Sequence, residues 1–147
     1  MTWSPETPYV TVDILIQMVD QPGSPVVLIE RVNPPHGWAL PGGFVDRGER
    51  AEVAAIREAK EETCLDVTLT GLLGVYSDPK RDPRLHTCSM VYVAEATGQP
   101  KAADDAKNIR VVDPTAPGVA LAFDHDLILA DLVAYRAHGA VAPLRMV

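Results

Sequence analysis

Residues 43–65 read GFVDRGERAEVAAIREAKEETCL, and this stretch carries the strongest helix signal in the chain. From Glu49 to Thr63 it consists largely of Ala, Glu, Lys and Arg and contains neither Gly nor Pro, a composition typical of an α-helix. One side of the predicted helix carries Ala51, Ala54 and Ala55. Because these side chains are small, we expect this face to approach other backbone closely rather than stand open to water.

Three carboxylates crowd into one sector of the same helix. Glu58, Glu61 and Glu62 follow the i, i+3, i+4 spacing, which places side chains next to one another on a helix surface. Glu58 and Glu62 are like charges one turn apart, which is unfavourable. Arg57 is expected to pair only with Glu61. The concentrated negative charge therefore predicts a bound cation.

A hard divalent ion would supply the missing positive charge. Mg²⁺ prefers carboxylate oxygens, keeps several waters and is commonly shared with substrate phosphates, and Mn²⁺ is the alternative. Gly42 and Gly43 precede the helix, allow close backbone approach and leave a carbonyl free to point at a metal. Two simpler interpretations stay open, namely a solvated acidic helix face and a tight turn at the glycines.

Composition restricts the class of protein. The 147 residues have a net charge of -7, with 47% hydrophobic and 22% charged residues, and predict a single domain over residues 1–147. Apolar runs are too short to span a membrane and no signal pattern is visible, so a soluble, cytoplasmic protein is expected. The isolated Cys64 and Cys88 fit a reducing compartment and exclude a cysteine zinc site. A pI near 4.9 argues against nucleic-acid binding.

Hydrophobic patterning outlines the remaining elements. Strands are expected at residues 9–19, 25–32, 67–76, 87–96 and 109–112, the first two as a hairpin. Residues 33–43 predict a shaped loop with a brief extended piece. A last helix is expected between Asp124 as its N-cap and Gly139 as its C-terminal stop. This order, β-β-α-β-β-β-α, favours an α/β fold with a mixed sheet sandwiched by helices.

The carboxylate helix resembles a known sequence motif. Residues 43–65 are similar to the Nudix box, Gx5Ex7REUxEExGU with U an aliphatic residue. The matching positions are Gly43, Glu49, Arg57, Glu58, Glu61, Glu62 and Leu65, with Ala59 at the first aliphatic position. Cys64 replaces the second glycine, and at a position with φ > 0 this costs on the order of 1 kcal/mol.

Segments outside the box resemble the ADP-ribose pyrophosphatase branch of this family. They are VTVDILIQMV, VVLIERVNPP, WALPGGFVDRGE, YSDPKRDPRLHTCSMVYVA, ADDA and LAFDHDLILAD, and they cover most of the chain from Val10 to Asp131. A proline noted in this branch after the box is matched by Pro79 or Pro83.

The resemblance implies a fold and an activity. The fold is a Nudix-type α/β/α sandwich with a central mixed β-sheet, and many members of this branch are homodimers. The activity is Mg²⁺-dependent cleavage of a nucleoside diphosphate linked to another moiety, here ADP-ribose to AMP and ribose 5-phosphate. A nucleoside triphosphate or oxidised nucleotide pyrophosphatase is the enzymatic alternative. A non-catalytic nucleotide-sugar binding module is the alternative of another class.

The resemblance also assigns roles within the box. Glu58, Glu62 and the carbonyl of Gly42 would be metal ligands, and Glu61 would bind metal or help to activate water. Arg57 would hold the carboxylates in register, and Glu49 would support the helix start or Arg57. The general base is expected in a later loop, at Asp104 or Asp105, although Asp also simply favours turns.

Other candidates lie outside the box. Arg31, Arg81 and Arg84 offer cations for substrate phosphates, together with Lys80 and His86. Asp78 and Asp82 lie among them, so an internally neutralised loop is the alternative. Trp38 is a candidate for stacking on adenine or for packing. His125 is expected to be structural, and Cys88 to be a buried small hydrophobe.

Overall fold

The computed structural model describes residues 2–147. These residues form one seven-stranded sheet along the path β3-β2-β1-β6-β5, with β4 paired to β1 and β7 paired to β2. The strands are β1 (Tyr9–Met18), β2 (Val26–Arg31), β3 (Trp38–Ala39), β4 (Gly42–Phe44), β5 (Thr68–Tyr76), β6 (Thr87–Ala96) and β7 (Ala106–Val112). The helices are α1 (Ala51–Thr63) and α2 (His125–His138).

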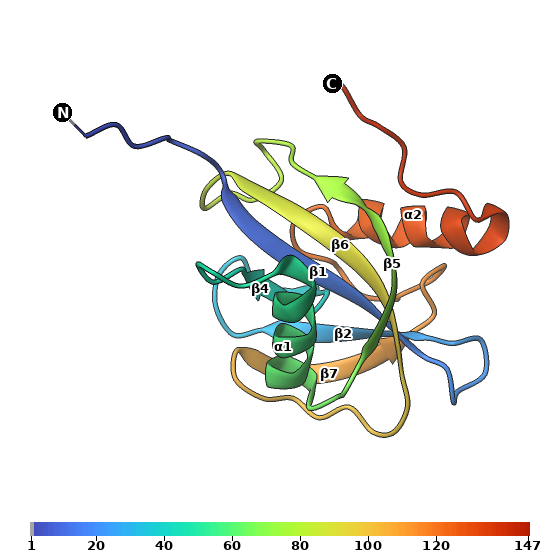
Figure 1. Ribbon diagram of the computed structural model, residues 1–147. Helices are drawn as coiled ribbons and strands as arrows, with labels where there is room; N and C mark the ends of the chain where they lie inside the picture. The colour runs from blue at the N-terminus through green and yellow to red at the C-terminus, as the bar shows by residue number, and fades with distance from the viewer. Residues whose placement is uncertain (1) are drawn as a thin grey trace.

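Strand β1 is the centre of the sheet. It pairs in parallel with β6 along its whole length, from Tyr9 opposite Thr87 to Met18 opposite Ala96, so the sheet is mixed (Figure 1). Its antiparallel pairing with β2 has the single register pair Gln17 and Val26, because β2 then diverges to pair with β7. The predicted hairpin of the first two strands is therefore present but short.

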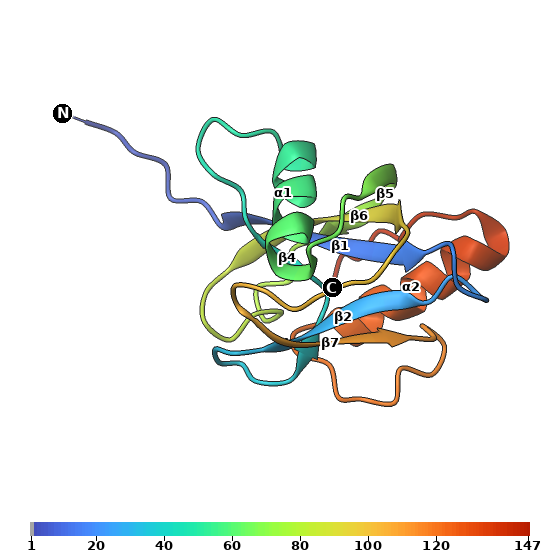
Figure 2. The ribbon, with the colours of Figure 1, turned by 90° about the horizontal axis from the view of Figure 1, so that it is seen from below.

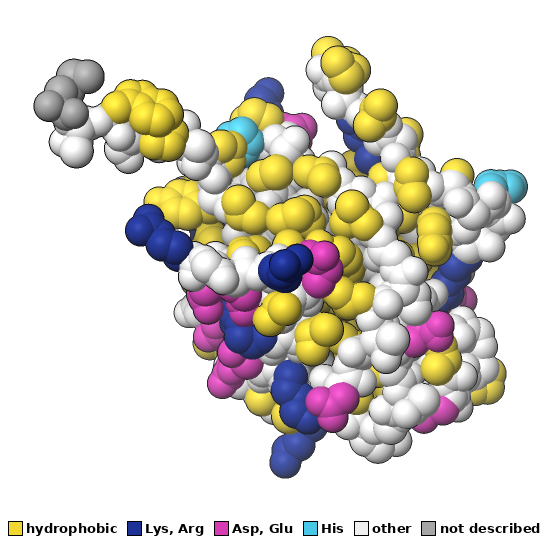
Figure 3. All heavy atoms as spheres, viewed as in Figure 1, with side chains coloured by type: hydrophobic (Ala, Val, Ile, Leu, Met, Phe, Trp, Pro, Cys, Tyr) yellow, Lys and Arg dark blue, Asp and Glu magenta, His cyan; other side chains and the backbone are white. Residues whose placement is uncertain are grey.

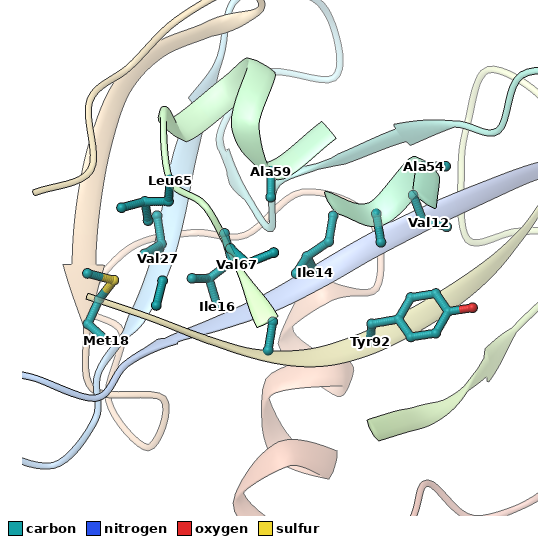
Figure 4. Packing of buried hydrophobic residues seen from close by; sticks show 13 residues of the cluster. Val12, Ile14, Ile16, Met18, Val27, Ala54, Ala59, Leu65, Val67 and Tyr92 are labelled. Carbon is teal, nitrogen blue, oxygen red and sulfur yellow. The ribbon is translucent and has the colours of Figure 1, made fainter. Parts of the chain in front are cut away.

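Two apolar layers hold the helices against the sheet. Successive side chains of a strand point to opposite faces, and Ile14 and Ile16 of β1 accordingly pack on the α1 side while Leu15 packs on the α2 side. Ala54 and Ala59 bring α1 close to the sheet, as Figure 4 shows. Figures 1 and 2 show α1 and α2 on opposite sides of the sheet. The predicted α/β fold with a central mixed sheet between helices is confirmed.

Several details of the elements differ from the prediction. Helix α1 begins at Ala51 rather than Glu49, and β7 begins at Ala106 rather than 109. The short strand β4 was not predicted, because its three residues include two glycines. Asp124 precedes α2 but makes no side-chain capping hydrogen bond, since its carboxylate accepts hydrogen bonds from Arg81. Gly139 ends α2 in the left-handed conformation as predicted.

The C-terminal tail lies along the sheet edge at β5. The N–H of Ala142 donates to the carbonyl of Leu73 at 2.9 Å. Further along, Arg145 donates to Asp131 at 2.8 Å, and the same carboxylate accepts the Tyr76 hydroxyl at 2.6 Å. These contacts cover part of an edge strand that would otherwise be open to pairing.

Two further expectations are answered by the fold. Neither helix within residues 2–147 has the length and apolar character of a membrane span. Cys64 and Cys88 are both free thiols, and Cys88 is half-buried rather than buried as expected. Its position in β6 turns its side chain toward the part of the sheet face that α1 leaves uncovered.

Candidate active site

Strand β4 lies so close to helix α1 at Gly43, and to strand β1 at Gly42, that both positions require glycine. A Cβ atom at Gly43 would lie 2.5 Å from the carboxylate of Glu58, and a Cβ at Gly42 would lie 2.2 Å from the carbonyl oxygen of Val12. Both distances are far inside van der Waals contact. The glycines before the helix therefore permit close packing, rather than only a tight turn.

Arg57 ties the carboxylates of this region together. Its guanidinium donates to Glu49 at 2.8 and 2.9 Å, to Glu58 at 3.0 Å and to Glu61 at 3.2 and 3.3 Å. The expectation that Arg57 pairs only with Glu61 is therefore wrong. Helical i, i+4 spacing does not account for Glu49, which precedes the helix, or for Glu58, whose side chain turns toward β4. Hydrogen bonds from Arg57 lower the pKa of Glu49 to about 2.

Glu62 is the carboxylate that this network leaves out. It is 5% exposed, and its Oε2 atom is buried without a hydrogen-bond partner. Burial, together with the charge of Glu58, raises the pKa of Glu62 to about 9. Burial also raises the pKa of Glu58, although Arg57 opposes it. Two adjacent carboxylates therefore resist ionisation unless a cation joins them.

The carbonyl of Gly42 is available beside these carboxylates. The Ile14 N–H donates to the carbonyl of Pro41, and the Val45 N–H donates to the carbonyl of Val10. This pattern makes Gly42 and its partner Asp13 a pair that exchanges no hydrogen bonds in the β1–β4 ladder. The backbone N–H and C=O of Gly42 therefore point away from β1. A backbone hydrogen bond from Gly42 also reaches Glu62 and lowers the pKa of that group.

The donors present fit a divalent ion that is completed by a ligand. Among residues 2–147, no group of three or more His, Cys, Asp or Glu side chains is arranged to hold a metal. The Glu61 carboxylate is turned toward Arg57 and is 42% exposed. Glu58, Glu62 and the Gly42 carbonyl remain together, and Mg²⁺ is often held by one or two carboxylates plus substrate phosphates. The orphaned oxygen of Glu62 is the observation that supports this fit.

A cleft opens on the other side of β4. Gly42 and Gly43 line it, so one strand separates the cleft from the carboxylates of α1. Three of the four predicted substrate residues, Arg31, Arg81 and Arg84, also line the cleft. Trp38 does not; it packs against the α2-side core, with the Arg110 guanidinium 5.2 Å from its ring.

The three arginines of the cleft differ in their partners. Arg81 is 8% exposed and donates to Asp124 at 2.7 and 3.0 Å and to Thr87 at 2.7 Å. Arg84 donates to Asp82 at 2.8 and 3.0 Å.

Arg31 has no comparable anionic partner. It donates to the carbonyl of Pro35 at 2.8 Å, and no carboxylate in the described chain lies at ion-pair distance from it. The alternative of an internally neutralised loop therefore describes Arg84, which pairs with Asp82, whereas the partner of Arg81 is Asp124 outside that loop.

A buried polar cluster lies beneath the cleft. Asp13 accepts a hydrogen bond from Ser89 at 2.5 Å and lies 3.5 Å from Nε2 of His125. The Leu40 N–H donates to Nδ1 of His125 at 2.9 Å, in line with the expected structural role of this histidine. Burial would raise the pKa of Asp13, but His125 and Arg81 lower it overall. We did not predict this cluster; a charged residue inside the apolar alternation of β1 was the available signal.

The structure places Asp105 close to the carboxylate helix. The backbone of the preceding loop is attached to α1, because Ala103 donates to the carbonyl of Glu62 at 3.2 Å. The charge of Asp105 contributes to the raised pKa of Glu62. Asp104 adopts a left-handed φ of 49° in the same loop. The role of either residue as a base stays a prediction.

Comparisons with known proteins show the family to which the chain belongs. The NUDIX domain family matches residues 8–133. An ADP-ribose pyrophosphatase of Methanocaldococcus jannaschii is 44% identical over 133 residues, which span 88% of this chain and 75% of that protein.

Solved structures show the same fold. A MutT/nudix family protein of Enterococcus faecalis has a TM-score of 0.78 at 29% identity, and the match covers 93% of this chain and 65% of that chain. The NUDIX domain of Shewanella oneidensis NrtR, crystallised with ADP ribose, has a TM-score of 0.78 at 22% identity, covering 91% and 94%.

The sandwich and its carboxylate helix define a Nudix-type domain, and the chain belongs to the Nudix family. More particularly, it is a Nudix hydrolase similar in sequence to the ADP-ribose pyrophosphatase of M. jannaschii over most of its length.

Proposed function

We propose that this protein is a divalent-metal-dependent pyrophosphohydrolase that cleaves ADP-ribose to AMP and ribose 5-phosphate. The similarity to an ADP-ribose pyrophosphatase over 88% of the chain carries the choice of substrate. The orphaned carboxylate oxygen of Glu62 supports the metal requirement. Mg²⁺ is the proposed ion, with Mn²⁺ as the alternative.

The residues of α1 and β4 would hold the metal. Glu58, Glu62 and the carbonyl of Gly42 supply the oxygen ligands, and Arg57 fixes the direction of Glu58 through a 3.0 Å hydrogen bond. Glu61 remains a further candidate ligand. When bound, the ion withdraws charge from the diphosphate and lowers the pKa of water.

Arginines of the cleft would bind the substrate, and an aspartate beside the carboxylate helix would accept the proton. Arg31 is suited to a phosphate group, because no carboxylate in the described residues pairs with it. Asp105 accepts a proton from the attacking water, with Asp104 or Glu61 as the alternative. Arg84 contributes a second cation at the cleft.

Product analysis tests this proposal directly. The purified protein is incubated with ADP-ribose and with nucleoside triphosphates, each with Mg²⁺ and with EDTA. Release of AMP and ribose 5-phosphate only with Mg²⁺ is expected. Pyrophosphate release from a triphosphate would favour the alternative enzyme, and tight ADP-ribose binding without turnover would favour the non-catalytic binding module.

We further propose that the protein forms a homodimer through an exposed apolar face. Figure 3 shows hydrophobic side chains gathered on the sheet face beside α1. Val10, Leu72 and Val75 are 44%, 46% and 56% exposed, and the strand registers place all three on the α1 side of the sheet. Sedimentation should detect a dimer, and Val75→Glu should shift it to monomer. A wild-type monomer would contradict this.

A further inference from the structure

Phe123 has an unusual backbone conformation at the wall of the cleft. Its φ is 58°, in the left-handed region, which a bulky residue other than glycine rarely adopts. Its side chain is half-buried and lines the cleft. Strain of this kind persists only where the surrounding structure enforces it, and it is often found at functional sites.

Both neighbours of Phe123 are fixed by hydrogen bonds. On one side, the Ala122 N–H donates to the carbonyl of Trp38 at 2.8 Å. On the other side, Asp124 accepts two hydrogen bonds from Arg81, at 2.7 and 3.0 Å. The conformation of residue 123 is therefore imposed from both directions, and Trp38 and Arg81 both contribute to it.

The imposed conformation brings the ring to two arginines. The Cζ atom of Arg31 lies 4.9 Å from the ring centroid and that of Arg84 lies 5.4 Å from it. Both distances are within the range of cation–π attraction. The ring thus holds side chains from β2 and from the loop before β6 at one wall of the cleft.

The two arginines beside the ring carry more positive charge than the carboxylates that pair with them neutralise. Only Arg84 has a carboxylate partner, Asp82, at 2.8 Å, whereas Arg31 has none within the described residues. Burial and the charge of Arg84 both lower the pKa of Arg31. Bringing two like charges to one ring is unfavourable until an anion binds to them.

We propose that Phe123 is a positioning residue, whose ring holds Arg31 and Arg84 together as a two-arginine subsite for a phosphate group of the substrate. This inference rests on the proposed function for the identity of the substrate. The residue acts through the arginines, and it lies across β4 from the carboxylate helix.

Leucine at position 123 provides the central test. Phe123→Leu keeps apolar bulk but removes the aromatic face, so KM for ADP-ribose should rise about tenfold. The kcat value should stay within about threefold, because the carboxylates of α1 are not touched. Phe123→Tyr, which restores an aromatic face, should recover most of the affinity. An unchanged KM in the leucine variant, or no recovery with tyrosine, would overturn the proposal.

Glycine at the same position separates positioning from stability. Phe123→Gly removes the ring and relieves the left-handed backbone, so it should unfold at a higher temperature than Phe123→Ala while both bind substrate poorly. Ser24→Gly is the matched control, since Ser24 has a φ of 46° and lies away from the cleft. It should change stability without changing KM. If the rise in KM tracked the fall in Tm across these variants, the positioning role would be overturned.

A binding measurement distinguishes this inference from the proposed function. Calorimetry with ribose 5-phosphate in EDTA should show binding to the wild type and about tenfold weaker binding to Phe123→Leu. If the wild type does not cleave ADP-ribose but shows this difference, the proposed function fails and the subsite stands. If it cleaves ADP-ribose but ribose 5-phosphate binds both proteins equally, or neither, the subsite is wrong.

Discussion

At the scale of single residues, Glu62 carries the strongest conflict with its surroundings. One of its oxygens is buried without a hydrogen bond, and Glu58 lies beside it. An ordinary structural carboxylate would be satisfied by a donor. This residue therefore gives the sharpest tests of the metal proposal.

Glu62→Gln should cut kcat at least about a hundredfold while the protein stays folded, because the amide removes one ligand charge. Steady-state kinetics with ADP-ribose and Mg²⁺ measures the loss, and circular dichroism checks the fold. Glu52→Gln is the matched control, since Glu52 is an exposed residue of the same helix that accepts a hydrogen bond from Tyr92 and lies outside the carboxylate cluster. Near-normal turnover by Glu62→Gln would exclude Glu62 as a ligand.

The raised pKa of Glu62 predicts a pH dependence of stability. The folded pKa is about 9, above the ordinary value of 4.5, so the folded state binds this proton more tightly than the unfolded state. The stabilising contribution is full below about pH 4.5 and is lost as the pH rises through about 9. In EDTA, Tm should therefore fall between pH 6 and pH 9.

Two comparisons isolate the contribution of this group. Glu62→Gln in EDTA should show a smaller fall in Tm over the same range. Added Mg²⁺ should reduce the fall in the wild type, because the ion favours the charged form. An equal fall in Tm between pH 6 and pH 9 for the wild type and the variant would show that the pKa of Glu62 is not raised.

At the scale of elements, the end of α1 departs from the family motif without losing its shape. Cys64 adopts a left-handed φ of 60°, and its N–H donates to the Lys60 carbonyl at 3.0 Å. The helix therefore ends where the motif requires, with a cysteine in a conformation that favours glycine. The cost of cysteine in place of the motif's glycine is therefore confined to backbone strain at residue 64.

Cys64→Gly should raise the free energy of unfolding by about 0.5–1 kcal/mol, because the exposed cysteine side chain contributes little packing and the backbone strain is relieved. Thermal unfolding should shift up by about 2 °C, with activity retained. Cys64→Ala keeps the Cβ atom and should not gain. A lower Tm for the glycine variant would show that the cysteine side chain packs usefully.

The glycines of β4 should respond differently to alanine. At Gly43 the new Cβ meets the flexible carboxylate of Glu58 at 2.5 Å, so Gly43→Ala should displace that carboxylate and reduce kcat while stability changes little. At Gly42 it meets the backbone of Val12 at 2.2 Å, so Gly42→Ala should lower Tm by several degrees. Melting curves and kinetics of both variants decide this, and equal loss of Tm would contradict it.

Sequence patterns predicted these elements where the signal was local. The composition of residues 49–63 predicted α1, and alternation predicted β1 to within one residue; β6 was also expected at its observed bounds. The strand β4 was missed, because it exists only through pairing with β1. Phe123 was missed because its conformation depends on contacts made by its neighbours to Trp38 and Arg81.

At the scale of the whole molecule, the features that sequence patterns did not predict depend on hydrogen bonds between residues far apart in the chain. Asp13 and Ser89 are 76 residues apart, and Leu40 and His125 are 85 apart, so no local pattern connects them. Arg57 illustrates the same limit over a shorter distance, since its bond to Glu49 spans eight residues. The carboxylate helix was predictable, whereas the cleft required the assembled sheet.

The buried carboxylate of Asp131, which joins β5, α2 and the C-terminal tail, offers a test at this scale. Arg145 and Tyr76 both donate to Asp131, which is 9% exposed. Tyr76→Phe should cost about 1–3 kcal/mol, because it leaves a buried carboxylate with one donor fewer. Denaturant unfolding measures the cost, and Tyr135→Phe is the control, since no side-chain hydrogen bond involves the Tyr135 hydroxyl in the described residues. Equal stability of the two variants would show that the Tyr76 hydroxyl contributes little to stability.

The three residues of β4 separate the two halves of the site. One half is the carboxylate helix α1, and the other is the cleft with its arginines. The backbone of β4 borders both halves, so a substitution in β4 would alter the carboxylates and the cleft together. Phe123 lines the cleft and makes no part of the carboxylate helix. New substrate preferences can therefore evolve, or be engineered, in the loop that carries Phe123 while the hydrolytic half is inherited unchanged.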